Sequence, residues 1–147
     1  MLRSIAVLIA VMSGAFLIDQ AVKSIFLEGF RWYSSCIDLI LVFNKGVAFS
    51  MFAFLEESLK WLQLLLLAGV ALYVLKLGKK CYFPPVGIMI GAGFSNVFDR
   101  FIHGGVVDYV YWHCGFDFAV FNFADVMIDV AVLWLLVLNF RPKTCRG

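Results

Sequence analysis

Four long apolar runs restrict the possible folds of this chain more than any other feature of its sequence. Hydrophobic residues make up 63% of the chain and charged residues 15%, whereas soluble domains average about 45–50% and about 25%. A helix needs about 20 mostly apolar residues to cross a bilayer, and each run approaches this length once neighbouring apolar residues are included. We predict one integral membrane domain over residues 1–147, with helices spanning residues 4–23, 59–77, 83–100 and 119–140.

The first run allows a second interpretation. Arg3 followed by an apolar stretch with small residues is also the pattern of a cleaved signal peptide. However, Asp19, Gln20 and Lys23 continue the run at helical spacing, as expected of a retained span that ends in polar groups. We therefore expect the first run to remain as a membrane helix.

The basic residues are concentrated on one side of the predicted helices. Seven of the 12 Lys and Arg residues fall at the termini or between the second and third helices: Arg3, Lys76, Lys79, Lys80, Arg141, Lys143 and Arg146. Short basic segments of membrane proteins stay in the cytoplasm. The sequence therefore predicts a multi-pass protein of the cytoplasmic (inner) membrane, with both termini cytoplasmic and the two longer connections outside.

The first outer connection, residues 28–55, is too apolar to be a simple linker. Two stretches rich in β-branched and aromatic residues, 37–43 and 47–52, flank an Asn-Lys-Gly turn signal at 44–46. We expect a small β-hairpin or sheet on the outer membrane face, with its phenylalanines against lipid or an apolar substrate. The alternative is a loop that packs on the helix bundle.

Two polar clusters lie next to the third and fourth apolar runs. The first ends in a Gly104-Gly105 break followed by Asp108, and the second places Asp125 in the first turns of the fourth helix. Ionisable residues at hydrocarbon depth are functional candidates. Two nearby carboxylates tend to share one proton, so one can act as base on a water while the other polarises a carbonyl. The clusters therefore suggest a pair of the aspartic-protease type, Asp108 and Asp125.

Other interpretations of these residues stay open at this point. Asp108 and Asp125 could each cap a helix or pair with Arg100. Asp129, four residues after Asp125, lies on the same helix face and competes for the second role. The same carboxylates could relay ions in a small transporter, or support helix pairing in a non-catalytic assembly factor. Ion flux without proteolysis would favour the transporter, and tolerance of Asp→Asn changes the assembly factor.

Several other kinds of site are poorly supported. The chain has four cysteines, without a C-x-x-C pair: Cys36, Cys81, Cys114 and Cys145. Their irregular spacing predicts unpaired thiols rather than disulfides or a zinc site. His103 and His113 have no ligand-like partners in the sequence, so we expect no metal and no cofactor. No basic run is interleaved with aromatic residues, which argues against nucleic-acid binding.

Five short blocks give the chain a resemblance to the lipoprotein signal peptidase (signal peptidase II) family over nearly its whole length. The blocks are Asp19-Gln20 with Lys23, Asn44-x-Gly46-x-Ala48-Phe49, Asn96-x-x-Asp99-Arg100, Gly105-x-Val107-Asp108-Tyr109, and Phe121-Asn122-x-Ala124-Asp125. Each block is weak alone, but five in the family's order on a four-span chain are specific. Ala119, where the family commonly has proline, and Val47, where it usually has a small residue, depart from the pattern.

The resemblance implies a fold, an activity and partners. The fold would be a four-helix membrane bundle with a small extracytoplasmic β-cradle between helices 1 and 2. The activity would be aspartic endopeptidase cleavage of diacylglyceryl-modified prolipoproteins, just before the lipidated cysteine, in the bacterial inner membrane. Globomycin would inhibit it, membrane lipid would surround it, and a monomer would suffice because one chain supplies the whole site.

The resemblance also assigns roles to individual residues. It implies that Asp108 and Asp125 are the catalytic pair, and so favours Asp125 over Asp129 by analogy alone. Residues expected on the substrate side are Asn44, Asn96 and Arg100, to which the residue chemistry adds Asn122 as a backbone-binding amide. Residues expected to support the site are Asp19, Lys23, Gly46 and Asp99.

Overall fold

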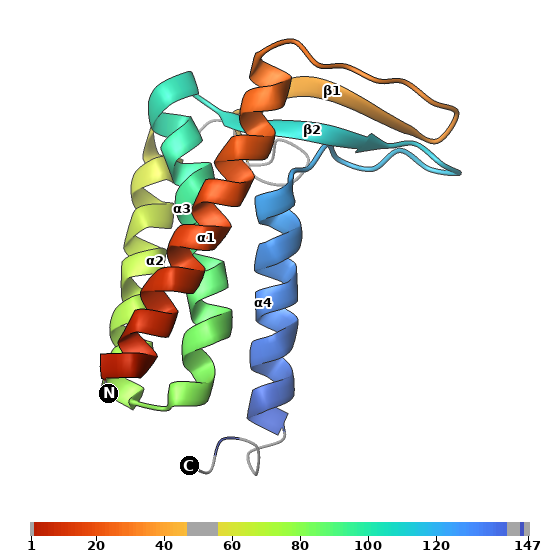
Figure 1. The fold of residues 1–147 in the computed structure, drawn as a ribbon. Coiled ribbons are helices and arrows are strands. Elements are labelled where there is room, and N and C mark those ends of the chain that lie inside the picture. The colour runs from red at the N-terminus through yellow and green to blue at the C-terminus, as the bar shows by residue number, and fades with distance from the viewer. Residues whose placement is uncertain (1, 47–55, 141–144, 146–147) are drawn as a thin grey trace.

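The chain forms a bundle of four helices with a two-stranded sheet across one end (Figure 1). The computed structural model describes residues 2–46, 56–140 and 145. The helices are α1 (Leu2–Leu27), α2 (Glu56–Leu77), α3 (Phe83–His103) and α4 (Phe123–Phe140), with the short 3-10 helix η3 (Lys80–Tyr82) before α3. All four long helices are long and apolar enough to cross a membrane. The expected four-helix membrane architecture is confirmed, and the chain is a multi-pass membrane protein.

Helix α3 lies at the centre of the bundle and packs against α1, α2 and α4. Half of its apolar window is buried, against 17% or less for the other three helices. Because half of α3 faces protein, its buried side can carry polar side chains that would be costly on a lipid-facing surface. Pro84 and Pro85 stand in its first turn, where a missing backbone N–H removes no helix bond.

Small residues let α1 approach α3 closely. Gly87, Gly91 and Ser95 follow one another at four-residue intervals on the α3 face toward α1, the small-residue spacing that favours close helix packing in membranes. A Cβ atom added to Gly91 would overlap the backbone of Met12 and lie 2.9 Å from its carbonyl carbon. This contact sets the register that brings the polar end of α1 against the polar end of α3.

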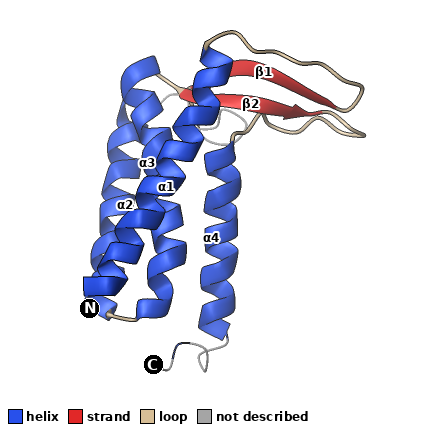
Figure 2. Cartoon of the chain, viewed as in Figure 1, coloured by secondary structure: helices blue, strands red, loops and turns tan. Residues whose placement is uncertain are grey.

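The sheet joins segments from two different connections (Figure 2). Strand β1 (Ile37–Asn44) lies between α1 and α2, and its antiparallel partner β2 (Val106–Trp112) lies between α3 and α4. The register runs from Ile37 opposite Trp112 to Asn44 opposite Val106. The second half of the predicted hairpin, residues 47–52, lies outside the described residues. The partner that the structure gives β1 is therefore a strand that our sequence interpretation treated only as a turn and a polar cluster.

Two glycines make this pairing possible. Gly104 ends α3 in the left-handed region with φ 72°, which glycine adopts without steric cost. A Cβ on Gly105 would lie 3.1 Å from the carbonyl oxygen of Asn44, so the absence of a side chain lets β2 pass close to β1. Helix α4 begins at Phe123 rather than at residue 119, because Phe121 still exchanges backbone hydrogen bonds with Val110 of β2.

The cysteines are paired, which corrects the prediction of unpaired thiols. Cys36 and Cys114 form a disulfide, as do Cys81 and Cys145. Cys36 precedes β1 and Cys114 follows β2, so the antiparallel register brings their Cα atoms to 4.4 Å. The two residues are 78 positions apart in the sequence. Their proximity depends on the β1–β2 pairing and has no signal in cysteine spacing.

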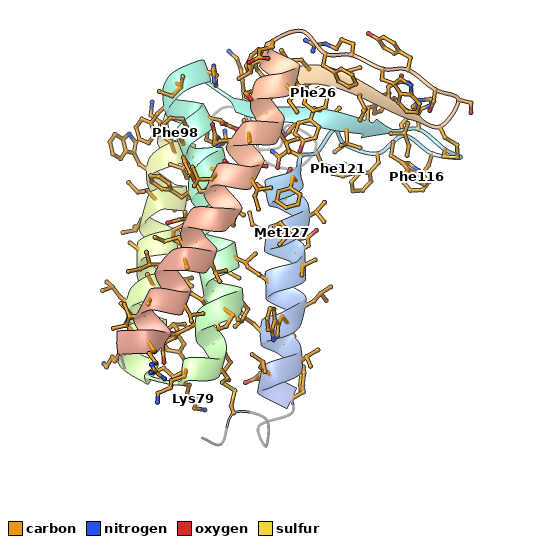
Figure 3. All side chains as sticks on the ribbon, in the orientation of Figure 1. Phe26, Lys79, Phe98, Phe116, Phe121 and Met127 are labelled. Carbon is orange, nitrogen blue, oxygen red and sulfur yellow. A yellow bond between two sulfur atoms is a disulfide. The ribbon has the colours of Figure 1, made fainter. Side chains whose placement is uncertain are left out.

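The two ends of the bundle differ in character (Figure 3). At the sheet end, Phe116, Phe118 and Phe121 form a row of edge-to-face ring contacts at centroid distances of 6.4 and 5.9 Å. Lys79 lies at the opposite end, exposed beside the ring of Tyr82. Aromatic rings gather at membrane interfaces, and basic residues gather on the cytoplasmic side of membrane proteins. The positions of the phenylalanines and of Lys79 therefore bear on which end of the bundle faces the cytoplasm.

Candidate active site

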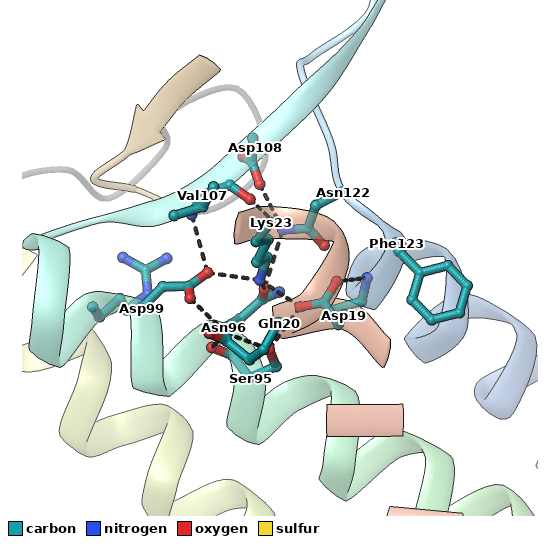
Figure 4. A network of polar contacts seen from close by, with 12 residues as sticks. Asp19, Gln20, Lys23, Ser95, Asn96, Asp99, Val107, Asp108, Asn122 and Phe123 are labelled. Carbon is teal, nitrogen blue, oxygen red and sulfur yellow. Dashed lines mark hydrogen bonds and ion pairs between the residues drawn. The ribbon is translucent and has the colours of Figure 1, made fainter. Parts of the chain in front are cut away.

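A cluster of polar side chains is buried where α1, α3, α4 and β2 meet (Figure 4). The buried polar and charged residues among those described are Asp19, Lys23, Ser95, Asn96, Asp99, Arg100, Asp108 and Asn122. They come from segments far apart in the chain, and most were singled out in the sequence. Burying charges in a membrane bundle is costly unless each is paired and hydrogen-bonded. Arg100 binds Gln63 and the turn after β1, and the other side chains of the cluster pair with one another.

Asp108 projects from β2 and is held by two amides. The Asn122 Nδ2 group donates to Asp108 Oδ1 at 2.7 Å, and the Asn44 Nδ2 group donates to Asp108 Oδ2 at 3.0 Å. Burial, and after it the charge of Asp125, raise the pKa of Asp108 to about 7, although both amides oppose this shift. Near neutral pH this carboxyl group is therefore poised between its two protonation states.

Asp125 stands in the first turn of α4 and is held by Asn122 and Asn96. The Asn122 side-chain oxygen accepts from the Asp125 backbone N–H at 2.9 Å, and Asp125 Oδ2 accepts from the Asn122 backbone N–H at 3.1 Å. This reciprocal pattern is a capping box, so one alternative left open by the sequence, a helix-capping Asp125, describes part of its role. Asp125 Oδ1 accepts from Asn96 Nδ2 at 2.9 Å.

Asn122 connects the two carboxylates. Its side-chain N–H groups reach Asp108, the Asn96 oxygen and the Val107 carbonyl, while its backbone N–H reaches Asp125. The side chain is fully buried, and these contacts turn its amide toward the protein's own groups. The structure thus brings Asp108 and Asp125 to opposite sides of one asparagine.

Behind the carboxylates lies a buried cluster of charges centred on Lys23. The Lys23 ammonium group is 2.6 Å from Asp19 Oδ2 and 2.6 Å from Asp99 Oδ2. Asp19 also accepts from Ser95 Oγ at 2.6 Å and from the Ala124 backbone N–H at 2.9 Å, which ties α1 to the start of α4. The i,i+4 pair of Asp19 and Lys23 is thus part of a three-helix network.

Asp99 and Arg100 are adjacent in sequence but face different partners. Asp99 accepts from Gln20 Nε2 at 2.8 Å and from the Val107 backbone N–H at 3.1 Å, in addition to Lys23. Asp99 thereby joins α1, α3 and β2, while Arg100 turns toward the end of β1.

Arg100 holds the turn that follows β1. Its guanidinium group donates to Gln63 Oε1 at 3.0 Å, to the Lys45 carbonyl at 3.3 Å and to the Gly46 carbonyl. Gly46 N–H in turn donates to Asn44 Oδ1 at 3.1 Å. Arg100 thus binds two successive backbone carbonyls, and this fixes the turn over the polar cluster.

These groups face a cavity of about 370 Å³ at the sheet end of the bundle. Its polar lining includes Asn44, Asn96, Arg100, Asp108 and Asp125. Apolar residues form the rest of the wall, among them Val106, Phe118, Phe121, Val126 and Ile128. Asp129 lines the same cavity one turn further along α4, so the geometry leaves its competition with Asp125 unresolved. The cavity offers carboxylates and amides on one part of its wall and apolar side chains on the rest, which suits a partly apolar ligand.

Three polar residues of the site received no role in the sequence interpretation: Gln20, Ser95 and Gln63. Gln20 bonds Ser95 and Asp99, and Gln63 bonds Arg100. Gln20 stands beside Asp19 in a recognised block, but its partners lie 75 or more positions away. Gln63 is a lone polar residue within an otherwise apolar run, and an interrupted apolar run was the signal that could have found it.

The fold and the site together define a multi-pass membrane protein in which several carboxylates line a cavity at one end of the helix bundle. The sequence model of signal peptidase (SPase) II matches residues 11–141. A lipoprotein signal peptidase of Sulfurimonas denitrificans is 66% identical over 145 residues, covering 99% of this chain and 95% of the relative. One from Sulfurovum sp. is 58% identical, covering 97% and 99%. The chain belongs to the signal peptidase II family and is a peptidase.

A solved structure supports the fold independently. A bacterial membrane enzyme determined by the in meso method at 2.3 Å resolution superposes with a TM-score of 0.77, covering 99% of this chain and 92% of the other. The two sequences are 18% identical, so the likeness concerns the fold alone. It extends over the four helices and the sheet end of the molecule.

Proposed function

We propose that this peptidase removes the signal peptide from diacylglyceryl-modified prolipoproteins, cleaving just before the lipidated cysteine, with Asp108 and Asp125 as its catalytic pair. The observation that carries the proposal is the cavity into which both carboxylates face while Asn122 holds them from behind. Family membership and the names of the relatives support the substrate class.

The reaction follows from one proton shared by the pair. The ionised carboxylate takes a proton from a water molecule as the water oxygen attacks the scissile carbonyl carbon. The protonated carboxyl group gives its proton to the carbonyl oxygen, which yields a neutral tetrahedral diol. Collapse of the diol breaks the C–N bond: one diol hydroxyl gives its proton to the ionised carboxylate, the amine nitrogen takes a proton from the protonated carboxyl group, and a carboxylic acid and an amine leave. The pair ends with the single proton that it had at the start.

The surrounding residues suit a lipid-anchored substrate. Asn44, Asn96 and Arg100 line the cavity beside the carboxylates and present amide and guanidinium groups to an extended peptide backbone. Phe118 and Phe121 line the apolar wall on the side where the diacylglyceryl chains would remain in lipid. Asp19, Lys23, Asp99 and the buried amide of Asn122 support these groups from behind. Gly46 lines the cavity and supports the site through its hydrogen bonds with Asn44 and Arg100.

The proposed orientation puts the cavity at the outer face of the bacterial inner membrane. Lys76, Lys79 and Lys80 lie at the bundle end opposite the sheet, and basic segments favour the cytoplasm. Both termini would then be cytoplasmic. A prolipoprotein anchored by its signal peptide in the same membrane would present its lipidated cysteine at the level of the cavity. One chain holds the complete pair, so a monomer suffices.

A cleavage assay tests this function directly. The purified protein in lipid should convert a diacylglyceryl prolipoprotein to the shorter form, with the new N-terminus at the lipidated cysteine, and globomycin should prevent the conversion. An unlipidated prolipoprotein is the matched control and should remain uncut. Ion flux across liposomes in the absence of cleavage would contradict the proposal and favour a transporter.

The cleavage rate is expected to fall as pH rises through about 7. Burial and the charge of Asp125 raise the pKa of Asp108 to about 7, and the mechanism needs one proton on the pair. Above this pH both carboxylates become ionised, so neither can protonate the carbonyl oxygen. A rate profile at saturating substrate from about pH 5 to about pH 9 measures the effect. A rate that stays constant to the alkaline end would contradict a proton shared near neutrality.

A further inference from the structure

Lys23 lies directly behind the proposed catalytic pair, fully buried between α1 and α3 (Figure 4). Its ammonium group contacts Asp19 and Asp99 at 2.6 Å each and donates to Asn96 Oδ1 at 2.8 Å. Stability alone is a weak reason for such an arrangement, because replacing a buried ion cluster by apolar residues is often neutral or stabilising. The third contact, to an amide that itself touches Asp125, connects the cluster to the proposed chemistry.

The ammonium group determines which way the Asn96 amide points. An ammonium group only donates hydrogen bonds, so Asn96 must turn its oxygen toward Lys23. Its NH₂ group then faces the other way and donates to Asp125 Oδ1 at 2.9 Å. A reversed amide would place NH₂ against the ammonium group and an oxygen against the Asp125 carboxylate.

The orientation of the Asn96 amide in turn determines the orientation of the Asn122 amide, which holds the second carboxylate. Asn96 Oδ1, already facing Lys23, also accepts from Asn122 Nδ2 at 3.1 Å. Asn122 must therefore direct its NH₂ group to this side, where it also reaches Asp108 Oδ1 at 2.7 Å. Its own oxygen is left to cap α4 at the backbone N–H of Asp125. One donor-only group thus determines the direction of two consecutive amides, and each amide holds one carboxylate.

We infer that Lys23 is a positioning residue of the peptidase reaction, which orients Asn96 and, through it, Asn122, so that both amides donate to the catalytic carboxylates. The inference rests on the proposed function, because it requires Asp108 and Asp125 to be the reacting pair. Within the part of the chain that the structure describes, the ion pairs of Lys23 go to Asp19 and Asp99. Lys23 therefore acts on the reacting pair through the two asparagines and through its charge.

The charge of Lys23 gives this role a measurable signature. Among the described residues, the charged groups near Asp108 include Asp19 and Lys23 from α1, Asp99 and Arg100 from α3, Asp125 and Asp129 from α4, and Lys45, which follows β1. The positive charge of Lys23 lowers the pKa of Asp108, against burial and the charge of Asp125, which raise it. Removing the ammonium group should therefore move the alkaline limb of the pH–rate profile to higher pH.

The first experiment is Lys23→Met in the full-length protein in lipid, with kcat and KM measured across pH on a diacylglyceryl prolipoprotein. We expect kcat to fall by about tenfold to about 100-fold, because small misplacements of catalytic groups have effects of this size. KM should change less than about twofold, and the alkaline limb should move up by roughly half a pH unit or more. Lys79→Met, at the opposite bundle end, should change none of these values.

A charge-balanced double variant separates the effect of Lys23 on the orientation of Asn96 from the effect of its charge. It also avoids a pair of buried carboxylates without their counter-charge, which could prevent folding. Lys23→Met alone leaves Asp19 and Asp99 as neighbouring buried carboxylates, whereas Lys23→Met/Asp99→Asn keeps the net charge of the three residues at its starting value. We expect the double variant to return the alkaline limb toward the wild-type position while kcat stays low, because Asn96 still lacks its ammonium donor.

The outcomes separate this inference from the function on which it rests. A wild-type kcat in Lys23→Met would overturn the inference. A lower kcat with an unmoved alkaline limb, and with an equal loss of globomycin-binding sites, would also overturn it, because this result means that Lys23 only stabilises the fold. Failure of both variants to fold would also count against it, because positioning requires the fold to survive without the ammonium group. Full activity of Asp108→Asn would instead overturn the catalytic pair itself.

Discussion

Asp108→Asn and Asp125→Asn are each expected to reduce prolipoprotein cleavage by about 10²–10⁴-fold. Asparagine preserves the size of each side chain, and its one oxygen can still accept from Asn122 at position 108 or from Asn96 at position 125, while its NH₂ group replaces the second accepting oxygen. It can neither take a proton from water nor give one to a carbonyl, so the shared-proton reaction stops. The measurement is the initial cleavage rate, normalised to the amount of protein recovered in the membrane.

Asp129→Asn is the matched control for this prediction. Asp129 lies on the same helix and lines the same cavity one turn away, but it is exposed, whereas Asp125 is held by Asn96 and Asn122. The Asp129 variant should retain substantial turnover. An inactive Asp129→Asn beside an active Asp125→Asn would show that the second catalytic carboxylate had been assigned to the wrong residue.

The pH dependence of the free energy of unfolding provides an independent measure of the raised pKa of Asp108. Its pKa is raised from 3.8 to about 7, so between these values the folded protein binds more protons than the unfolded chain. The stability contributed at this residue therefore decreases as pH rises through the window and stays at the lower value above about 7. Asp108→Asn removes the titration, so thermal unfolding of the variant should lose this component of the pH dependence while activity is absent.

The architecture was readable from the sequence because it depends on local patterns. Apolar runs of spanning length define the four helices, and the polar clusters that follow the third run and open the fourth, with Asp108 and Asp125, mark the site. The pairing of β1 with β2 was not readable in this way. It joins segments 62 or more positions apart, as in Asn44 opposite Val106, and the turn signal at 44–46 favoured a nearer partner.

The partners of individual charges depend on the same long-range register. The sequence places Asp19 and Lys23 one helical turn apart, which predicts their ion pair, but Asp99 reaches Lys23 only because α1 and α3 pack closely. The disulfide between Cys36 and Cys114 likewise follows from the register of the sheet. Local periodicity identifies which residues are unusual, and helix and strand packing decides which of them meet.

Gly91→Ala is expected to destabilise the protein by about 3 kcal/mol or more, at the upper end of the range for overpacked interiors. The added methyl group would overlap the Met12 carbonyl, a backbone group that cannot rotate away as a side chain can. Helices α1 and α3 would have to separate. Ser95 lies one turn further along α3 and bonds Asp19 at 2.6 Å, so the separation would also pull the charged cluster apart and lower activity.

Thermal unfolding in detergent and the cleavage rate together measure this effect, with Gly69→Ala as the matched control. Gly69 is also a helical glycine in a predicted span, but a Cβ there meets nothing within 4 Å. Alanine has the higher helix propensity by about 1 kcal/mol, so Gly69→Ala should leave stability unchanged or slightly raised. Equal behaviour of the two variants would show that close approach of α1 to α3 is dispensable. Selective loss in Gly91→Ala would show that the polar site depends on a helix contact formed one turn below it.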